Sequence, residues 1–307
     1  MEDGNPGAVQ VIINARSGAS GQDAECERIA ELFGASRFDA HISIGRTGDD
    51  LLELARRAAA GDAKTIVAGG GDGTISAVAS TLIGTNKTLG VLPLGTLNHF
   101  AKDLKIPLDL EAATRTIVAG HAVHIDVGEV NNRIFINNSS LGLYPGLVHH
   151  REQQERLGHG KWPAFVWAAF SMMRRYPFID VRLNADGREF SSRTPFVFVG
   201  NNEYGMESLN IGKRARLDAG LLSLYAIHHT GRLGLLRLGL SALFKRLGDA
   251  EGLVSMLTDE IWIEMPRKRV RVSTDGEVVT MQPPLRYRIR PGALRVIVPA
   301  GDSEVKA

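Results

Sequence analysis

This sequence contains little cysteine and no long apolar runs, and its net charge is small. Cys26 is the single cysteine in 307 residues, which excludes an internal disulfide and fits a reducing, intracellular compartment. No stretch approaches the roughly 20 uninterrupted apolar residues of a membrane span, and the polar N-terminus lacks a signal-peptide pattern. Lys and Arg number 36 against 34 Asp and Glu, a formal charge of +2, which argues against a nucleic-acid partner. We expect a cytoplasmic protein that contacts a membrane at most peripherally, at its inner face.

At 307 residues the chain is long enough for two domains, each with a core. In the first part, short apolar strands alternate with segments of helical spacing, which predicts an α/β domain with a parallel sheet. The strands are expected at 8–14, 38–44, 65–68 and 89–92, and the helices at 22–33, 49–60, 75–83 and 107–120. From 124 onward, runs of period two follow one another without helices between them, which predicts a β-sandwich-like second domain.

The stretch 64–104 has the order of elements that a phosphate site needs. The apolar strand 65–68 leads into GGGDGT at 69–74, and an apolar run of helical spacing follows at 75–83. Three glycines in a row let the backbone approach an anion, and the first N–H groups of the next helix carry the positive end of its dipole. Asp72 cannot itself attract phosphate, so a carboxylate in this cradle predicts Mg²⁺.

A second loop, PLGTLNH at 93–99, directly follows the strand 89–92. Because neighbouring parallel strands end at the same sheet edge, Gly95 and Thr96 are expected beside the first loop, where open α/β sheets bind ligands. Two ordinary strand-to-helix turns are the alternative, since glycine is common in both. Three glycines followed by Asp, Gly and Thr exceed what a turn requires.

GGGDGT at 69–74 together with PLGTLNHFA at 93–101 resembles the catalytic domain of the diacylglycerol kinase family. The likeness is greatest to the bacterial soluble lipid kinases, which include diacylglycerol, sphingosine-type and phosphatidylglycerol-type kinases. NAD kinases and phosphofructokinases share the GGDG loop, whereas the paired PLGTxN element points to the lipid kinases. The resemblance implies an NAD kinase/diacylglycerol kinase-like α/β domain at 1–124, a β-rich lipid-binding and catalytic domain at 125–292, and a return strand at about 293–300 in the first domain.

The resemblance also implies ATP as the phosphate donor and Mg²⁺ as its metal. The nucleotide-binding residues that it implies are Asn14, Thr47, Gly69, Gly70, Gly71, Asp72, Gly73, Thr74, Gly95, Thr96 and Asn98, and Asp72 would also engage the metal and act in catalysis. A local turn is the alternative role for Asn14, and a helix cap is the alternative for Thr47. One departure stands at His99, where the family usually has Asp.

The stretch RVRVSTDGE at 269–277 resembles the place where this family carries its proposed base, an acidic residue that takes the proton of the lipid hydroxyl. Phosphoryl transfer uses such a carboxylate beside the groups that position the substrates. An Asp-Gly pair between two alternating strands is also the strongest short signal for a two-residue hairpin turn. Both interpretations are compatible, and Asp275 and Glu277 are predicted as the base region without a choice between them.

A structural Mg²⁺ site is implied at 216–222, RLDAGLL. Relatives bind this metal through the second Asp of an LDDGLL run and neighbouring backbone carbonyls, which carries over to Arg216, Asp218 and Leu221 here. Ala219 replaces the second Asp and supplies only its carbonyl oxygen. Either Asp218 substitutes through a local shift, or the site is absent.

The predicted function is transfer of the γ-phosphate of ATP to a hydroxyl of a membrane lipid. The stretches 162–175 and 231–246 combine apolar and basic residues, which is typical of a membrane-interface helix and equally of an amphipathic helix packed on a core. One alternative is an NAD kinase-like enzyme with a soluble acceptor, kept open by Asn202-Glu203. Another is a catalytically impaired nucleotide- or lipid-binding regulator, motivated by His99 and Ala219. The sequence predicts neither the acceptor lipid nor the oligomeric state.

Overall fold

The computed structural model describes residues 8–15, 22–142, 178–204, 214, 216–227 and 253–300. The chain forms two compact units. The first comprises Met1–Val127, Arg216–Asp218 and Pro291–Ala307, and the second comprises Gly128–Ala215 and Ala219–Arg290. Two long strands, β5 (Ala122–Val130) and β16 (Leu285–Ile297), contribute residues to both units.

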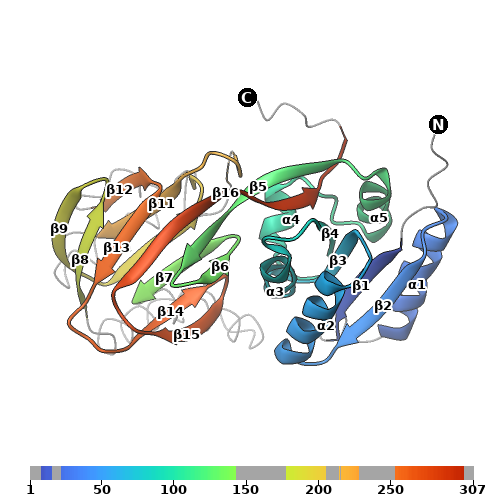
Figure 1. Ribbon diagram of the computed structural model, residues 1–307, viewed down its shortest axis with the longest axis horizontal. Helices are drawn as coiled ribbons and strands as arrows, with labels where there is room; N and C mark the ends of the chain where they lie inside the picture. The colour runs from blue at the N-terminus through green and yellow to red at the C-terminus, as the bar shows by residue number, and fades with distance from the viewer. Residues whose placement is uncertain are drawn as a thin grey trace, which may run out of the picture. The chain divides into compact units, whose positions relative to one another are not determined.

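The first unit is built on a parallel sheet. Its strands are β1 (Val9–Asn14), β2 (Ala40–Gly45), β3 (Thr65–Gly70) and β4 (Thr88–Pro93), in the spatial order β2-β1-β3-β4 (Figure 1). All neighbouring pairs are parallel, and the last part of β16 joins β4 in the same sense, with Val296 opposite Leu89. Every residue of β4 is buried, as expected for a central strand that is covered on both faces. The predicted α/β fold is confirmed.

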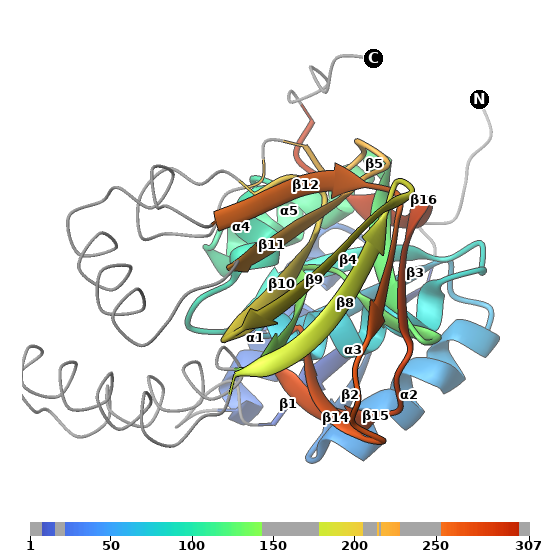
Figure 2. The same ribbon diagram turned by 90° about the vertical axis from the view of Figure 1, so that its left-hand side faces the viewer.

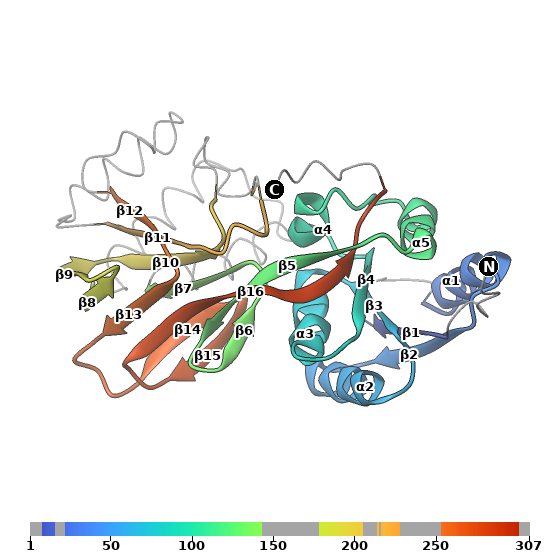
Figure 3. The same ribbon diagram turned by 45° about the horizontal axis from the view of Figure 1, so that its top comes forward.

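Helices cover both faces of this sheet. They are α1 (Gln22–Ala35), α2 (Gly48–Ala60), α3 (Asp72–Leu82), α4 (His99–Asp103) and α5 (Leu110–Ala119). Figure 3 shows α2 and α3 on one face and α1 and α5 on the other, the arrangement that right-handed crossovers produce. The start of α2 is a capping box, because the Asp50 N–H donates to the Thr47 hydroxyl and the Thr47 N–H donates to the Asp50 carboxylate, both at 3.1 Å.

The second unit consists of two β-sheets with a common core (Figure 2). In one sheet the order is β12 (Leu253–Thr258), β11 (Leu222–Ile227), β10 (Phe196–Asn201), β7 (Asn138–Gly142), β14 (Val270–Thr274) and β15 (Glu277–Met281). In the other, β16 is followed by β13 (Glu260–Glu264), β8 (Ile179–Ala185) and β9 (Arg188–Thr194), and β5 pairs with β16 and with β6 (Arg133–Phe135). Inward-facing residues of both sheets form the core, among them Leu141, Leu224, Leu183 and Tyr287. The predicted β-rich second domain is confirmed.

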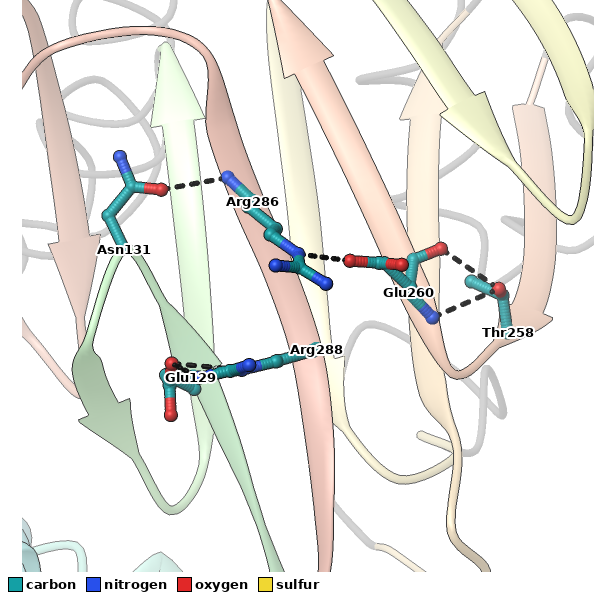
Figure 4. Close-up of polar contacts among 6 residues, drawn as sticks. All are labelled: Glu129, Asn131, Thr258, Glu260, Arg286 and Arg288. Atoms are coloured by element: carbon teal, nitrogen blue, oxygen red, sulfur yellow. Dashed lines mark hydrogen bonds and ion pairs between the residues drawn. The ribbon is translucent and has the colours of Figure 1, made fainter.

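Charged side chains attach β5 to β16 within the second unit (Figure 4). Glu129 is buried, and its carboxylate accepts hydrogen bonds from Arg288 at 2.6 and 3.0 Å and from Arg290 at 3.3 Å. One residue beyond β5, the side-chain oxygen of Asn131 accepts the backbone N–H of Arg286 at 2.8 Å. On the other side of β16, Arg286 pairs with Glu260 of β13. The strand that continues into the first unit is therefore held on both sides by ionic and polar contacts.

The end of the chain differs from the sequence prediction. The family resemblance implies a second domain that ends at 292 and a separate return strand at about 293–300. The structure instead has one continuous strand, β16, in which the buried positions change from odd numbers, such as Tyr287, to even numbers, such as Val296. Gly292 has a φ of 58° and donates its N–H to the Asp126 carboxylate at 2.8 Å. The irregularity thus reverses the strand's buried face without ending it.

The two stretches predicted to bear on the lipid, 162–175 and 231–246, lie outside the described residues. Across the part of the chain that the structure describes, none of the helices combines the length and the apolarity needed to cross a membrane.

Candidate active site

The loops that carry the predicted nucleotide-binding residues leave the first unit's sheet at one edge. The strand register places Asn14 opposite Gly45 and Gly70 opposite Pro93, so the carboxyl ends of all four parallel strands lie in one row. The Asn14 side chain donates to the Thr74 hydroxyl at 3.0 Å and links the end of β1 to the first turn of α3. Open parallel sheets bind their ligands at this edge.

The two glycine-containing loops are in contact with each other. A Cβ atom on Gly95 would lie 2.4 Å from the Cα atom of Gly71, and a Cβ atom on Gly70 would lie 2.6 Å from the Thr74 hydroxyl oxygen. Gly71 is the N-cap of α3 and supplies no side-chain hydrogen bond, so the first N–H groups of α3 receive no cap from it. A close-packed glycine cradle at a helix N-terminus of this kind fits a phosphate group.

Asp72 joins the two loops through its carboxylate. One carboxylate oxygen accepts the backbone N–H of His99 at 3.1 Å, and the other accepts that of Phe100 at 3.0 Å. Asp72, the first residue of α3, therefore caps the start of α4, which the sequence did not predict. A carboxylate oxygen has lone pairs beyond one hydrogen bond, so the residue also fits the predicted role of a Mg²⁺ ligand.

Asn98 shapes the second loop. It has a φ of 50°, it is buried, and its amide nitrogen donates to the carbonyls of Pro93 and Gly95 at 3.1 and 2.7 Å. Its amide oxygen accepts the Gly95 N–H at 3.1 Å. These bonds hold the turn from inside, whereas Thr96 is exposed on it. Thr96 is therefore a polar side chain of this loop that a ligand can reach.

Asp275, the first predicted base residue, occupies a hairpin turn in the second unit. Thr274 of β14 pairs with Glu277 of β15, and the two residues between them, Asp275 and Gly276, have φ values of 49° and 88°, as a type I′ turn requires. The Asp275 carboxylate accepts three backbone N–H groups, from the consecutive residues 136, 137 and 138, at 2.8, 2.8 and 3.1 Å. The predicted hairpin is present, and its aspartate is fixed to a neighbouring backbone segment.

Glu277, the second predicted base residue, has a different environment. Its carboxylate accepts a hydrogen bond from Arg133 at 2.5 Å; the Glu277 side chain is 60% exposed and that of Arg133 is 39% exposed. Arg133 also donates to the Thr274 hydroxyl at 2.8 Å. Glu277 is thus held by one ion pair at the surface, whereas Asp275 is held by three backbone donors.

Sequence reasoning missed a buried polar cluster behind Asp275. Arg214 is 5% exposed, and it donates to the Ile136 carbonyl at 2.7 Å and to the Asn137 side chain at 2.8 Å. Asn201 and Tyr204 donate to the carbonyls of Ile136 and Asn137, each at 2.9 Å. The signal for this cluster is the polar run after the apolar strand 196–201, but no sequence pattern connects that run to residues 136–137.

At the predicted structural Mg²⁺ site, the Asp218 carboxylate is paired with an arginine. Arg216 donates to both oxygens of Asp218, at 3.0 and 3.4 Å, and this contact raises the pKa of Arg216. The Ala219 N–H donates to the Asn202 side chain at 3.0 Å, and the Leu221 carbonyl accepts the Asn202 N–H at 2.9 Å. Among the described residues, no three His, Cys, Asp or Glu side chains are grouped so as to hold a metal ion. Metal binding at 216–221 stays a prediction.

Comparison with known proteins identifies both parts of the chain. Residues 8–130 match the diacylglycerol kinase catalytic domain, and residues 144–298 match the YegS C-terminal NAD kinase beta sandwich-like domain. A diacylglycerol kinase of Staphylococcus aureus (strain bovine RF122 / ET3-1) is 29% identical over 223 residues, which cover 71% of this chain and 70% of the relative. A diacylglycerol kinase of strain JH9 is 31% identical over 186 residues, covering 59% and 58%.

Solved structures share the fold. The crystal structure of a diacylglycerol kinase from Bacillus anthracis str. Sterne matches with a TM-score of 0.70 and 20% identity, over 95% of this chain and 97% of the other. A second structure from that organism, assigned to the same class, matches with a TM-score of 0.78 and 22% identity, over 97% of each chain.

Two glycine loops in contact at the carboxyl edge of a parallel sheet are the arrangement expected of a nucleotide-binding kinase domain. The family matches agree, and the chain is a phosphotransferase. It belongs to the diacylglycerol kinase family, as the loop motifs predicted.

Proposed function

We propose that this kinase transfers the γ-phosphoryl group of ATP to a hydroxyl group of a membrane lipid of the diacylglycerol type. The observation that carries the proposal is the contact between the Gly71 and Gly95 loops beside an N-terminus of α3 that Gly71 does not cap. Such a cradle suits a polyphosphate. The family match and the names of the curated relatives supply the lipid class.

In the proposed reaction, the first N–H groups of α3 and the backbone of Gly70, Gly71 and Gly95 bind phosphate oxygens, while the exposed Thr96 adds a hydroxyl donor. Asp72 is the residue that would hold Mg²⁺ at the cradle. The metal ion, when bound, neutralises charge on the phosphates. Asn14 and Asn98 support the cradle through their bonds to Thr74 and to the 93–98 loop.

The acidic turn would serve the acceptor. The lipid hydroxyl oxygen forms the new bond to the γ-phosphorus as the bond to the ADP oxygen breaks, and a carboxylate takes the hydroxyl proton. Asp275 and Glu277 are the candidates for this proton transfer. Their unequal surroundings, three backbone donors against one exposed ion pair, make them separable by mutation.

A lipid acceptor requires the enzyme to meet a bilayer. We therefore place the reaction at the inner face of the cell membrane, in a cytoplasmic protein with peripheral contact. The apolar and basic stretches at 162–175 and 231–246 are the proposed contacts, on their composition alone.

An NAD kinase-like enzyme is the second candidate, because the second family match describes an NAD kinase beta sandwich-like domain. In the sequence, the pair Asn202-Glu203 supports this alternative, because such a pair could bind ribose hydroxyls. In the structure the Asn202 side chain is buried, and its amide oxygen accepts the Ala219 N–H at 3.0 Å. An asparagine used in this way supports a loop, which favours the lipid acceptor.

Transfer of labelled phosphate from ATP and Mg²⁺ tests the proposal. The protein is incubated with diacylglycerol in mixed micelles, with a total lipid extract, with NAD and with water alone, and the products are separated by chromatography. Label in phosphatidic acid or in another lipid supports a lipid kinase and identifies its acceptor. Label in NAD alone refutes the lipid acceptor, and tight ATP binding without any transfer supports the catalytically impaired regulator.

A further inference from the structure

The bend at Ile136-Asn137 joins the two sheets of the second unit, and a strand pairs only part of its backbone: the Asn137 C=O accepts the N–H of Asn201, at the end of β10, at 2.9 Å. β6 ends at Phe135 and belongs to one sheet, while β7 begins at Asn138 and belongs to the other. Ile136 and Asn137 are buried, with exposures of 0% and 6%. Buried backbone N–H and C=O groups need partners, and side chains bind the remaining groups, the N–H groups of Ile136 and Asn137 and the C=O of Ile136.

The N–H side of the bend faces Asp275, and the C=O side faces Arg214 and Tyr204. Ile136 C=O and Asn137 N–H belong to one planar peptide group. Its oxygen accepts from Arg214 at 2.7 Å, and its nitrogen donates to Asp275 at 2.8 Å. In the next peptide group, the Asn137 oxygen accepts from both the Tyr204 hydroxyl and the Asn201 N–H, each at 2.9 Å, and the Asn138 nitrogen donates to the same Asp275 oxygen at 3.1 Å.

We propose that Arg214 is a positioning residue for the Asp275 carboxylate and acts on it through the peptide groups of the Ile136-Asn137 bend. The proposal rests on the proposed function, since Asp275 lies in the acidic turn. A guanidinium bound to a carbonyl oxygen draws electron density toward that oxygen and makes the N–H of the same peptide group a stronger donor. Arg214 thus orders and polarises the donors that orient Asp275.

The geometry around Arg214 suits this role. The guanidinium lies over the ring of Tyr204, with its central carbon 5.3 Å from the ring centroid, and both residues are 5% exposed. It also donates to the Asn201 carbonyl at 3.2 Å and to the Asn137 side chain at 2.8 Å. The planar guanidinium of Arg214, bound to several fixed acceptors, is held in one orientation. The ammonium group of a lysine, on a flexible side chain, would not be held in this way.

Amide NMR spectra of the full chain test the relay without reference to activity. Arg214→Met keeps much of the side-chain volume and removes the charge, while Tyr204→Phe keeps the ring and removes the hydroxyl. In Arg214→Met we expect an upfield shift of the Asn137 amide proton that is larger than the shift of the Asn138 amide proton. In Tyr204→Phe we expect the reverse, with the larger upfield shift at the Asn138 amide proton. Arg286→Met is the matched control, since Arg286 also lies over an aromatic ring, that of Trp262, at 5.1 Å. It should move neither resonance.

Kinetics test the consequence for Asp275. Supporting residues around a site typically contribute about 10- to 100-fold, so kcat of Arg214→Met is expected to fall by roughly that factor while KM for ATP changes less than about twofold. Arg214→Lys keeps the charge and should recover part of the loss. Thermal unfolding of each variant verifies folding; should Arg214→Met not fold, Tyr204→Phe and Arg214→Lys carry the comparison.

Three results would overturn the proposal: unchanged Asn137 and Asn138 resonances in the folded variants, an unchanged kcat, or equal effects in Arg286→Met. A wild-type chain that transfers no phosphate would refute the proposed function instead, and the amide resonances would then decide the relay alone.

Discussion

Gly95 lies so close to Gly71 that a Cβ atom on Gly95 would be 2.4 Å from the Gly71 Cα atom. Real Cβ atoms do not approach a backbone atom this closely, and a backbone cannot move aside as the end of a flexible side chain can. Each loop is therefore shaped by the other. The relation explains why the two glycine motifs, more than 20 residues apart in the sequence, act as one site.

Gly95→Ala should separate the two loops and damage nucleotide binding. Because displacements of about 1 Å can cost roughly 100-fold in rate, we expect kcat/KM for ATP to fall at least about tenfold. Gly34→Ala is the matched control, since Gly34 lies in α1 and a Cβ atom there would have no neighbouring atom within 4 Å. Steady-state kinetics of both variants make the comparison, and equal kcat/KM values in the two variants would show that the loop contact is not needed.

Asp72→Asn should abolish turnover without unfolding the protein. Loss of the negative charge weakens metal binding, which we expect to reduce kcat by about 100-fold or more. The asparagine oxygen can keep the bond to the Phe100 N–H, and water can replace the bond to the exposed His99 N–H, so the free energy of unfolding should change by less than about 1 kcal/mol. Asp109→Asn at the start of α5 makes the same change at a cap outside the site, where Asp109 accepts the Ala112 N–H at 2.9 Å. Near-normal turnover in Asp72→Asn would refute the metal role.

Asp275→Asn and Glu277→Gln should differ in stability. An amide at Asp275 turns an NH₂ group toward backbone N–H donors, and an unsatisfied buried donor costs about 1–3 kcal/mol. Glu277→Gln breaks one exposed ion pair and should cost less than about 1 kcal/mol. Urea denaturation measures both. If Glu277→Gln alone lost activity at full stability, Glu277 would be the base; if it stayed active, the base would be Asp275.

The α/β domain and the glycine loops were predictable from the sequence because they depend on local order. In a parallel sheet, strands alternate with helices along the chain. The loop GGGDGT at 69–74 fits phosphate binding only where it directly follows a strand. The capping of α4 by Asp72 was not predictable, because it joins residues 27 and 28 positions apart in the sequence. Only the packing of two loops brings these groups together.

The same reason applies in the second unit. The Asp-Gly hairpin at 275–276 was readable from its neighbours, but the partners of Asp275 lie more than 130 residues earlier in the chain. The continuity of β16 through Pro291-Gly292 was not predictable, since a proline and a glycine usually end a strand. Here the Asp126 carboxylate binds the Gly292 N–H and the strand continues, which is a tertiary contact that overrides a local preference.

Tyr287 should make the protein sensitive to alkali. Burial raises the pKa of this phenol, and a hydrogen bond with Ser139 opposes the shift only in part. The unfolded chain ionises Tyr287 at about pH 10, whereas the folded chain keeps its proton to higher pH, so stability is full below that value and falls as pH rises above it. Tyr287→Phe should remove up to about 1.4 kcal/mol per pH unit of this slope. Urea denaturation from pH 8 to 11 measures it, and identical slopes in the two proteins would contradict the assignment.

Arg288→Met should destabilise the protein more than Glu129→Gln. The Glu129 side chain is 5% exposed, while those of Arg288 and Arg290 are each 43% exposed. Without Arg288 a buried carboxylate keeps only the 3.3 Å contact with Arg290, and a buried charge that loses its partner costs several kcal/mol. Without the Glu129 charge, water can solvate the two half-exposed guanidinium groups, so we expect a loss of only about 1–2 kcal/mol. Denaturation of both variants by urea, with Arg182→Met at the exposed pair with Glu264 as the control, measures the order. A larger loss in Glu129→Gln would mean that the arginines, and not the carboxylate, are the groups that water cannot reach.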